Sequence, residues 1–374
     1  MLDVFVPARL GMARRIRGMT ASGLADLAGI TPEWVSLAEN EKKVPSPATV
    51  REFSRVLDFP FEFFYRPVPA HPPVDAFHFR ATSRLAKKDE ATARALSIIA
   101  MELASWINGS YKVPPPAVPE VQDLADAEVN LAPETVAESV RNSWGLGSAP
   151  IPNLMQVLEA KGAKIFSAGG PLKAIDAFSF RDGQTPVIFL NIHKSPERLR
   201  FDLAHELGHL VMHGGSLGVE NGKAKEQAAN DFASAFLMPR SDVVGTVRGG
   251  LLLEDVLRLK SRWRVSAMAL TFRVHRLGIV SDWTYSTLAR QLSSAGFRSS
   301  EPGSDLAPES SSLLTQLMDD LRSQGKGFLD VARVLDIRAQ DVRDLMLGLV
   351  TFGLPGEATI RERSRADLRA VSNE

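Results

Sequence analysis

Apolar residues recur every three or four positions along most of the chain, which is the spacing of amphipathic helices. Over residues 83–111 the stripe consists of Leu96, Ile99, Leu103 and Ile107, and it predicts one long helix. Patterns typical of strands are confined to a short central part. We therefore predict an α+β fold that is mostly α, with a small sheet.

Two of the strand patterns lie next to each other, at Ile175–Arg181 and Pro186–Asn191. Between them stands Asp182-Gly183, a dipeptide that favours a hairpin turn. A third short strand is predicted at Ala163–Phe166. The second hairpin strand leads directly into a helix whose apolar stripe carries unusual polar residues.

That helix contains His205-Glu206-x-x-His209, the H-E-x-x-H pattern of zinc metallopeptidases. Positions i and i+4 lie on one face of a helix, so the two imidazoles can bind one metal ion. Glu206 is then placed to act as a general base on water. Histidine is scarce, at 7 of 374 residues, which makes this clustering informative.

A catalytic zinc needs a third protein ligand. A second core helix is predicted downstream, with apolar positions at helical spacing up to Pro239. Glu226 in its first turn is the candidate ligand, and Asn230, one turn further, is the candidate partner of a ligand imidazole. Two alternatives stay open: Glu220 as the ligand, with Glu226 stabilised only by the helix dipole, and His213 as a third histidine that reaches the cleft.

The edge of a sheet beside such a metal site commonly binds an extended substrate by strand addition. Asn191 and His193 lie at the end of the second hairpin strand and are candidates for substrate contact. A turn-forming asparagine and a solvated histidine are the competing interpretations.

Residues 8–66 are predicted to form an all-helical unit. Thr20 can cap a short helix, Gly29 can make a turn, and Thr31 can cap the next helix, with Pro32 at its first position. This order is typical of a helix-turn-helix.

The unit resembles the Xre family of phage-repressor and Cro-like DNA-binding domains. The resemblance implies contact with double-stranded DNA, in which the second helix of the motif reads base edges. The implied reading positions are Thr31, Glu33, Trp34 and Ser36, and the implied phosphate contacts are Thr20, Ser22, Lys42 and Lys43.

This sequence departs from the Xre pattern in three ways. Ala21 stands where the family often has glutamine, Gly23 lies inside the first motif helix, and Glu33 puts a negative charge at the reading surface. Residues 1–68 hold nine Lys/Arg against eight Asp/Glu, a net charge of +1, which is a weak footprint for DNA. A role in dimerisation or protein contact is the alternative.

Composition narrows the choice of function. The formal net charge of the whole chain is zero, so it is not a polyelectrolyte binder. The chain has no cysteine, which excludes disulfides and thiol ligands. We find no signal-peptide pattern and no apolar run of transmembrane length, and we expect a cytoplasmic protein without a membrane partner.

The end of the chain is again helical. The stretch 293–312 is rich in Ser, Gly and Pro and is predicted to be a mobile linker, and the tail after Gly353 is expected to be poorly ordered. Residues 328–347 have helix-turn-helix spacing, but their acidic residues favour contact with protein over DNA.

Taken together, His205–His209 and the helix Glu226-x-x-Ala-Asn-x-Phe-Ala-x-x-x-Leu-Met-Pro239 closely resemble the ImmA/IrrE metallopeptidases. The resemblance implies a zincin-like domain that binds Zn²⁺, with His205, His209 and Glu226 as ligands and Glu206 as the base. It also implies cleavage of a helix-turn-helix repressor. The domains we predict are 1–68 (Xre-like), 69–118 (linker and long helix), 119–285 (peptidase) and 286–374 (linker and C-terminal helices).

Two functions are therefore in competition. The first is a zinc endopeptidase that regulates genes by cutting a helix-turn-helix repressor. The second is an Xre-type regulator in which the peptidase fold serves as a sensor or dimerisation domain, with a second copy of the chain as a candidate partner. A third hypothesis is that the protein is a partner in a toxin–antitoxin or phage-linked operon.

Overall fold

The computed structural model describes residues 4–70, 77–80, 86–124, 132–172, 175–213, 222–247, 250–350 and 369–370. Helices dominate these residues and strands are few, which confirms the predicted mostly α fold. Among the described helices none is long and apolar enough to cross a membrane. The predicted domain boundaries stay predictions.

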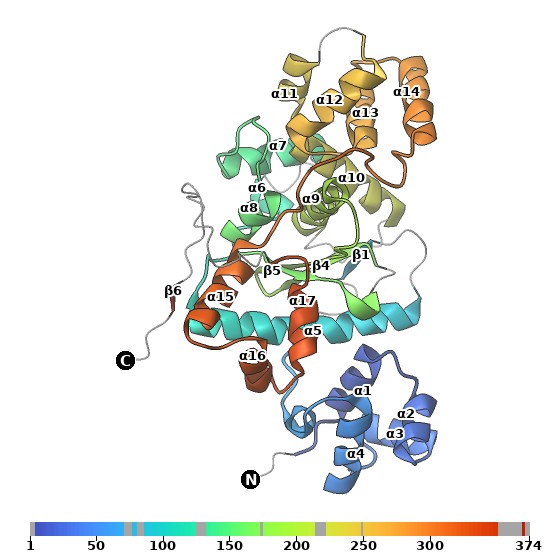
Figure 1. Cartoon of the computed structure of the whole chain (residues 1–374), viewed down its shortest axis with the longest axis vertical. Coiled ribbons are helices and arrows are strands. Elements are labelled where there is room, and N and C mark those ends of the chain that lie inside the picture. The colour runs from blue at the N-terminus through green and yellow to red at the C-terminus, as the bar shows by residue number, and fades with distance from the viewer. Residues whose placement is uncertain are drawn as a thin grey trace.

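The N-terminal part is a cluster of short helices, and it lies at one end of the molecule in Figure 1. Its elements are α1 (Pro7–Ile16), α2 (Ala21–Ala28), α3 (Pro32–Glu39), α4 (Pro47–Leu57) and the 3₁₀ helix η1 (Phe61–Tyr65). Thr20 caps α2, Gly29 takes a left-handed φ of 67° in the turn, and Thr31 caps α3. The predicted order of cap, turn and cap is confirmed.

A small sheet forms the middle of the molecule. Its strands are β1 (His78–Arg80), β3 (Lys164–Ser167), β4 (Ala177–Asp182) and β5 (Thr185–Leu190), in the order β1-β4-β5-β3. The β4–β5 hairpin turns at Gly183 (φ 56°), as the sequence indicated. Strand β3 pairs with β5 in parallel, and β1 pairs with β4 antiparallel.

Helices cover both faces of this sheet (Figure 1). On one face runs the long helix α5 (Lys87–Ser110), and on the other lie α9 (Pro196–Met212) and α10 (Gly222–Leu237). Helices α9 and α10 pack closely because Gly208 has no side chain: a Cβ there would lie 3.1–3.3 Å from Phe232 and the backbone of Ala229. This close approach brings one face of α10 against the H-E-x-x-H face of α9.

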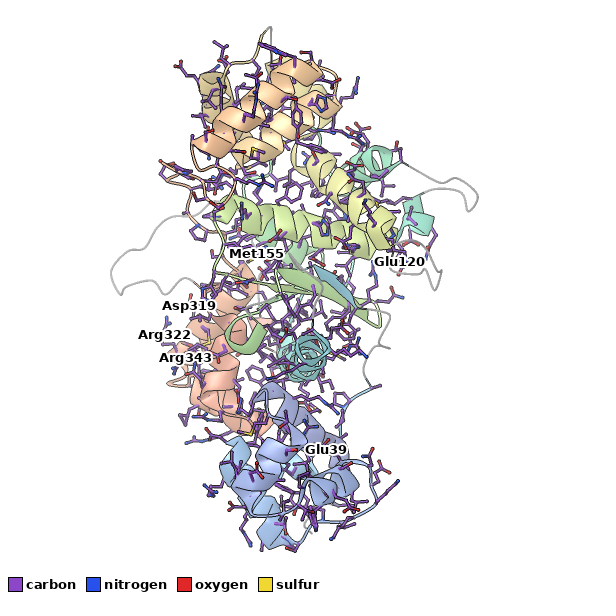
Figure 2. All side chains as sticks on the ribbon, turned by 90° about the vertical axis from the view of Figure 1, so that its right-hand side faces the viewer. Glu39, Glu120, Met155, Asp319, Arg322 and Arg343 are labelled. Atoms are coloured by element: carbon purple, nitrogen blue, oxygen red, sulfur yellow. The ribbon has the colours of Figure 1, made fainter. Side chains whose placement is uncertain are left out.

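Seven further helices of the described residues accompany α9 and α10 between positions 121 and 294. They are α6 (Val121–Leu124), α7 (Pro133–Ser143), α8 (Leu154–Ala160), α11 (Arg240–Thr246), α12 (Leu253–Trp263), α13 (Ala267–Arg276) and α14 (Asp282–Ser294). A short 3₁₀ turn, η3 (Gly170–Leu172), follows β3, and β2 (Tyr111–Lys112) pairs with β6 (Arg369–Ala370). Figure 2 shows the N-terminal cluster, the sheet layer and the α11–α14 group following one another along the long axis.

The segment 295–311 has no regular structure, but it is not the mobile linker that its composition suggested. Glu301 is buried and forms an ion pair with Lys260 of α12, with 2.9 Å between Oε2 and Nζ. Glu309 forms an ion pair with the buried Arg200 of α9. Buried charges paired in this way hold the coil against the peptidase helices.

The chain then returns to the N-terminal cluster through α15 (Ser312–Ser323), α16 (Phe328–Leu335) and α17 (Ala339–Met346). Asp341 accepts two hydrogen bonds from Arg17, at 2.7 and 2.9 Å, and Asp336 accepts one from Arg66 at 2.9 Å. Arg338, just before α17, forms an ion pair with Asp58 of the N-terminal cluster, so here the C-terminal part supplies the cation. These ion pairs join the C-terminal helices to the chain's own N-terminal cluster. The predicted preference of residues 328–347 for a protein partner over DNA stays a prediction. The tail expected to be poorly ordered lies largely outside the described residues.

Candidate metal centre

The metal centre is built on α9. Ser195 precedes the helix and Pro196 takes its first position, where a missing N–H costs nothing. Buried residues run without a break from Asp202 to Val211, so the polar groups of this stretch need partners inside the protein.

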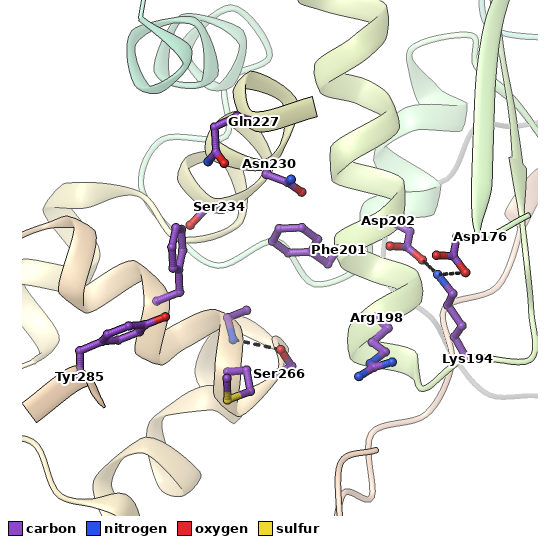
Figure 3. Close-up of a pocket in the computed structure, with 13 residues that line it drawn as sticks. Asp176, Lys194, Arg198, Phe201, Asp202, Gln227, Asn230, Ser234, Ser266 and Tyr285 are labelled. Atoms are coloured by element: carbon purple, nitrogen blue, oxygen red, sulfur yellow. Dashed lines mark hydrogen bonds and ion pairs between the residues drawn. The ribbon is translucent and has the colours of Figure 1, made fainter. Parts of the chain in front are cut away.

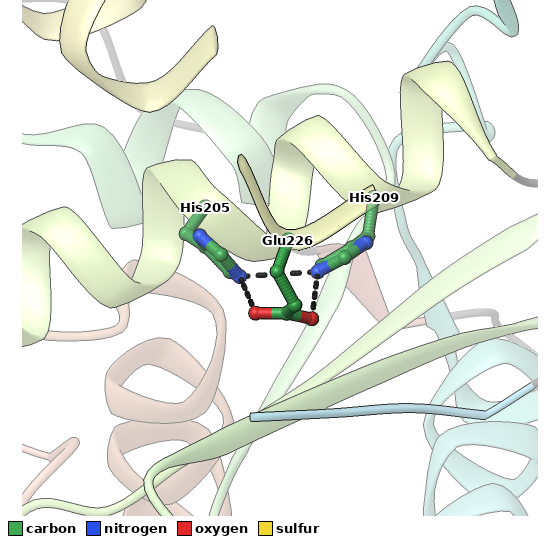
Figure 4. A group of neighbouring side chains, drawn as sticks. All are labelled: His205, His209 and Glu226. Atoms are coloured by element: carbon green, nitrogen blue, oxygen red, sulfur yellow. Dashed lines mark hydrogen bonds and ion pairs between the residues drawn. The ribbon is translucent and has the colours of Figure 1, made fainter. Parts of the chain in front are cut away.

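His205 and His209 project from the same face of α9, one turn apart, and both are buried. Their Nε2 atoms lie 3.0 Å from each other. Glu226 of α10 meets them both: its Oε2 is 3.4 Å from Nε2 of His205 and its Oε1 is 3.1 Å from Nε2 of His209 (Figure 4). The ligand atoms of these three residues all lie within 4.8 Å of one another, which is an arrangement that can hold a metal ion.

Glu226 lies one turn deeper in α10 than expected. The helix begins at Gly222, so its first turn carries no acidic residue, and the expectation that Glu226 belongs to that turn is wrong. The helix-dipole interpretation loses its basis for the same reason, because the dipole acts within the first turn. Burial alone would raise the pKa of Glu226, but hydrogen bonds from His205 and His209 and their charge lower it below its usual range.

Asn230 orients the first histidine. Its Oδ1 lies 3.0 Å from Nδ1 of His205. A carboxamide oxygen only accepts hydrogen bonds, so Nδ1 carries the proton and donates it. In the neutral ring, which is the form that binds a metal, the lone pair is therefore on Nε2, the atom that faces Glu226.

Glu206 follows the first histidine and is fully buried. The hydroxyl of Ser179 on β4 donates a hydrogen bond to its Oε2 at 2.6 Å. Sequence reasoning missed Ser179. The available signal was a polar residue between two phenylalanines, Phe178 and Phe180, in the predicted strand.

The structure also locates the competing candidates. His213 is buried next to His209, with ring centroids 5.5 Å apart, and it is not one of the three converging groups. Glu220 lies outside the described residues. Asn191 forms a turn: its Oδ1 accepts from the N–H of His193 at 3.2 Å, and its side-chain amide donates to the carbonyl of Ile175. The side chain of His193 is exposed.

A cavity of about 520 Å³ adjoins this centre between α9, α10, α13 and α14. Asn230 lies in its wall, so the residue that orients His205 also faces the cavity (Figure 3). Phe201, Phe272 and Tyr285 contribute aromatic surface, and Lys194 is held by Asp176 and Asp202 at 2.9 and 2.5 Å.

The residues predicted to contact DNA are grouped on the N-terminal cluster, but several are engaged locally. The hydroxyls of Thr20 and Thr31 accept hydrogen bonds from the first turns of α2 and α3. Trp34 packs against Phe53, with ring centroids 5.9 Å apart, and Nζ of Lys43 lies 5.0 Å above its ring. The remaining predicted contacts are exposed: Ser22, Glu33, Ser36 and Lys42.

Comparison with known proteins supports the peptidase part. Residues 158–275, from α8 to α13, match the family model Peptidase_M78, described as the IrrE N-terminal-like domain. The match indicates a metallopeptidase domain of the ImmA/IrrE type, and it contains all three converging residues. A comparison with curated proteins found no match. The family match does not extend to residues 4–70, so the Xre resemblance there stays a prediction.

Proposed function

We propose that this protein is a zinc-dependent endopeptidase of the gluzincin type. The observation that carries the proposal is the convergence of His205, His209 and Glu226 from two helices. Two imidazoles and one carboxylate are a common ligand set for catalytic zinc, because they leave a coordination position open. The side chain of Glu226 is 43% exposed, so the group is accessible from solvent.

The residues present fit zinc in their donor chemistry as well as in their number. Asn230 fixes the tautomer that presents Nε2 of His205, and a carboxylate completes the set without any thiolate. When bound, zinc supplies a Lewis acid that activates water and polarises a peptide carbonyl.

Glu206 moves the protons of the reaction. Its carboxylate accepts the proton that water loses on attack and returns it to the nitrogen of the leaving amine. Ser179 holds Oε2 in place, so the carboxylate enters each cycle in one orientation. Oriented groups of this kind lower the entropic part of the barrier.

The proposed target is a helix-turn-helix repressor, so that cleavage changes gene expression in the cytoplasm. Support comes from the likeness of residues 158–275 to the IrrE N-terminal-like domain and from the cap–turn–cap helices α2 and α3 in the same chain. The N-terminal cluster then recruits DNA or a related repressor to the peptidase.

A second candidate is a DNA-binding regulator, and the α2–α3 pair favours it. The charges argue against strong DNA binding. Five of the cluster's nine cations are paired, Arg9 with Glu102, Arg14 with Glu39, Arg17 with Asp341, Arg55 with Glu52 and Arg66 with Asp336. Each phosphate contact adds about 0.9 to the slope of log affinity against log salt concentration. In a mobility-shift titration, a slope well above the value for the four remaining cations would favour the regulator.

The ligand assignment is tested by changing Glu226. We expect Glu226→Ala to lose zinc at micromolar free metal, while the fold measured by circular dichroism persists. Glu220→Ala, the matched control, should keep zinc. Full zinc occupancy in the Glu226 variant, measured by atomic emission after gel filtration, would contradict the proposed ligand set.

A further inference from the structure

The edge of β4 next to the metal centre is covered by a segment of the same chain. Strand β1 pairs with β4 in the register His78↔Ser179, Phe79↔Phe178 and Arg80↔Ala177. Without β1, β4 would be the edge strand on this side of the sheet. The segment belongs to the connection between the N-terminal cluster and α5.

Phe77 anchors the segment just before the pairing begins. Its side chain is 9% exposed and packs on two rings of β4, with centroids 4.6 Å from Phe180 and 6.5 Å from Phe178. The guanidinium of Arg94 on α5 lies 5.8 Å from the centre of its ring. The segment is therefore held by side-chain packing as well as by the backbone pairing of β1.

The pairing takes place beside the residue that holds the proposed base. The partner of His78 is Ser179, whose hydroxyl donates to Glu206 at 2.6 Å. Neighbouring strands lie about 4.8 Å apart, so the backbone of His78 passes one strand spacing from the residue that holds the base. In Figure 4 the blue strand runs below the Glu226 carboxylate, on the side toward the sheet.

An extended peptide that adds to a sheet edge binds through its backbone, and this is how β1 is bound. While β1 is in place, no other peptide can pair with that edge of β4. The peptide that pairs with the residue holding the base is therefore part of this chain.

We propose that the chain is its own substrate, and that the site cuts in cis within residues 77–80. This inference rests on the proposed peptidase function. The amide C–N bond breaks, the oxygen of water joins the carbonyl carbon, and Glu206 transfers the proton to the new amine. The cut breaks the chain between the N-terminal helices and the peptidase part, which is the outcome expected of a peptidase whose targets are helix-turn-helix proteins.

Four ion pairs hold the two products together after the cut. Arg9 is buried against Glu102 of α5, Arg17 and Arg66 bind the acidic helices α16 and α17, and Arg338 binds Asp58. A nicked chain therefore keeps its native size, and the cut is visible only after denaturation.

The experiment uses the full chain, purified with chelator and then supplied with Zn²⁺. Denaturing mass spectrometry should show two fragments whose junction lies within residues 77–80. The rate should be independent of protein concentration, and Glu206→Gln should stay intact. Mixed with wild type, a tagged Glu206→Gln chain should also stay intact, and its cleavage would contradict a reaction in cis.

Changes at Phe77 test the role of the paired segment. Phe77→Asp should slow self-cleavage at least tenfold, because a buried carboxylate would release the segment. Phe77→Leu, the matched control, keeps an apolar anchor and should cut at close to the wild-type rate. In the metal-free Glu206→Gln chain, amide exchange of residues 77–80 should rise on Phe77→Asp and stay slow on Phe77→Leu.

A quenched fluorescent peptide with the sequence of residues 72–86 tests self-cleavage and the peptidase function separately. It should be cut faster by the Phe77→Asp chain, whose β4 edge is open, than by wild type. A wild-type chain that cuts this peptide while staying intact would overturn self-cleavage and leave the peptidase function standing. A zinc-loaded chain that cuts neither itself nor the peptide would overturn both.

Discussion

At the scale of single residues, the site depends on side chains that orient the proposed metal ligand and the proposed base. Asn230 fixes the ring of His205, and Ser179 fixes Glu206. Helical spacing and the usual pairing of a ligand imidazole sufficed to predict Asn230. Spacing said nothing about Ser179, because its partner is 27 residues away and meets it only when the strand packs under α9.

Removing the Asn230 carboxamide should weaken metal binding without removing a ligand. Asn230→Ala leaves His205 free to rotate and to change tautomer, and loss of such a partner typically costs 10- to 100-fold in affinity. Competition with a chromophoric chelator measures the change. Asn230→Asp restores an acceptor and should recover most of the affinity. Equal affinity of wild type and Asn230→Ala would show that another group orients His205.

At the scale of elements, the close contact of α9 and α10 places the carboxylate over the imidazoles. Both helices and the β4–β5 hairpin were predictable, since their apolar periodicity is strong. Strand β1 was not, because three residues carry no alternation signal and their partners lie about a hundred positions further along the chain. The coil 295–311 was also misjudged: its composition is that of a linker, and only the partners of Glu301 and Glu309 show that it is fixed.

Gly208 is the residue that permits the α9–α10 contact, so a side chain there should disturb the metal centre from a distance. Gly208→Val would push against Phe232 and the backbone of Ala229. We expect a loss of about 1–3 kcal/mol in the free energy of unfolding, as for other overpacked cores. Because Glu226 moves with α10, zinc affinity should fall as well. Gly245→Val on α11, where a Cβ meets nothing within 4 Å, is the control. Wild-type zinc affinity in Gly208→Val would contradict this account.

At the scale of the whole molecule, the C-terminal segment ties the peptidase part to the N-terminal cluster. One end of this tie is Glu159 on α8. Its carboxylate accepts hydrogen bonds from the hydroxyl of Ser311 and from the N–H groups of Ser312 and Leu313, at 2.8 and 3.1 Å, at the start of α15. Burial raises the pKa of Glu159 to about 7, and burial lowers the pKa of nearby Lys164 to about 8.

The raised pKa of Glu159 predicts a pH-dependent stability. Between the ordinary glutamate pKa of 4.5 and the raised pKa of about 7, the folded state binds more protons at Glu159 than the unfolded state does. The contribution of Glu159 is therefore fully present below pH 4.5 and is lost as pH rises through 7. The free energy of unfolding of wild type relative to Glu159→Gln should fall by up to about 3 kcal/mol over this window. Urea titrations at several pH values measure it, and a constant difference would contradict the buried, protonated carboxyl.

The central claim is that a metal-dependent peptidase operates at this centre, with Glu206 moving the protons. The most direct measurement compares zinc content and hydrolysis of the peptide 72–86 for Phe77→Asp chains with and without Glu206→Gln. We predict equal zinc in both chains and a rate at least a hundredfold lower when Glu206 is replaced, as for the loss of a general base. Equal rates in two chains with equal zinc would contradict the account.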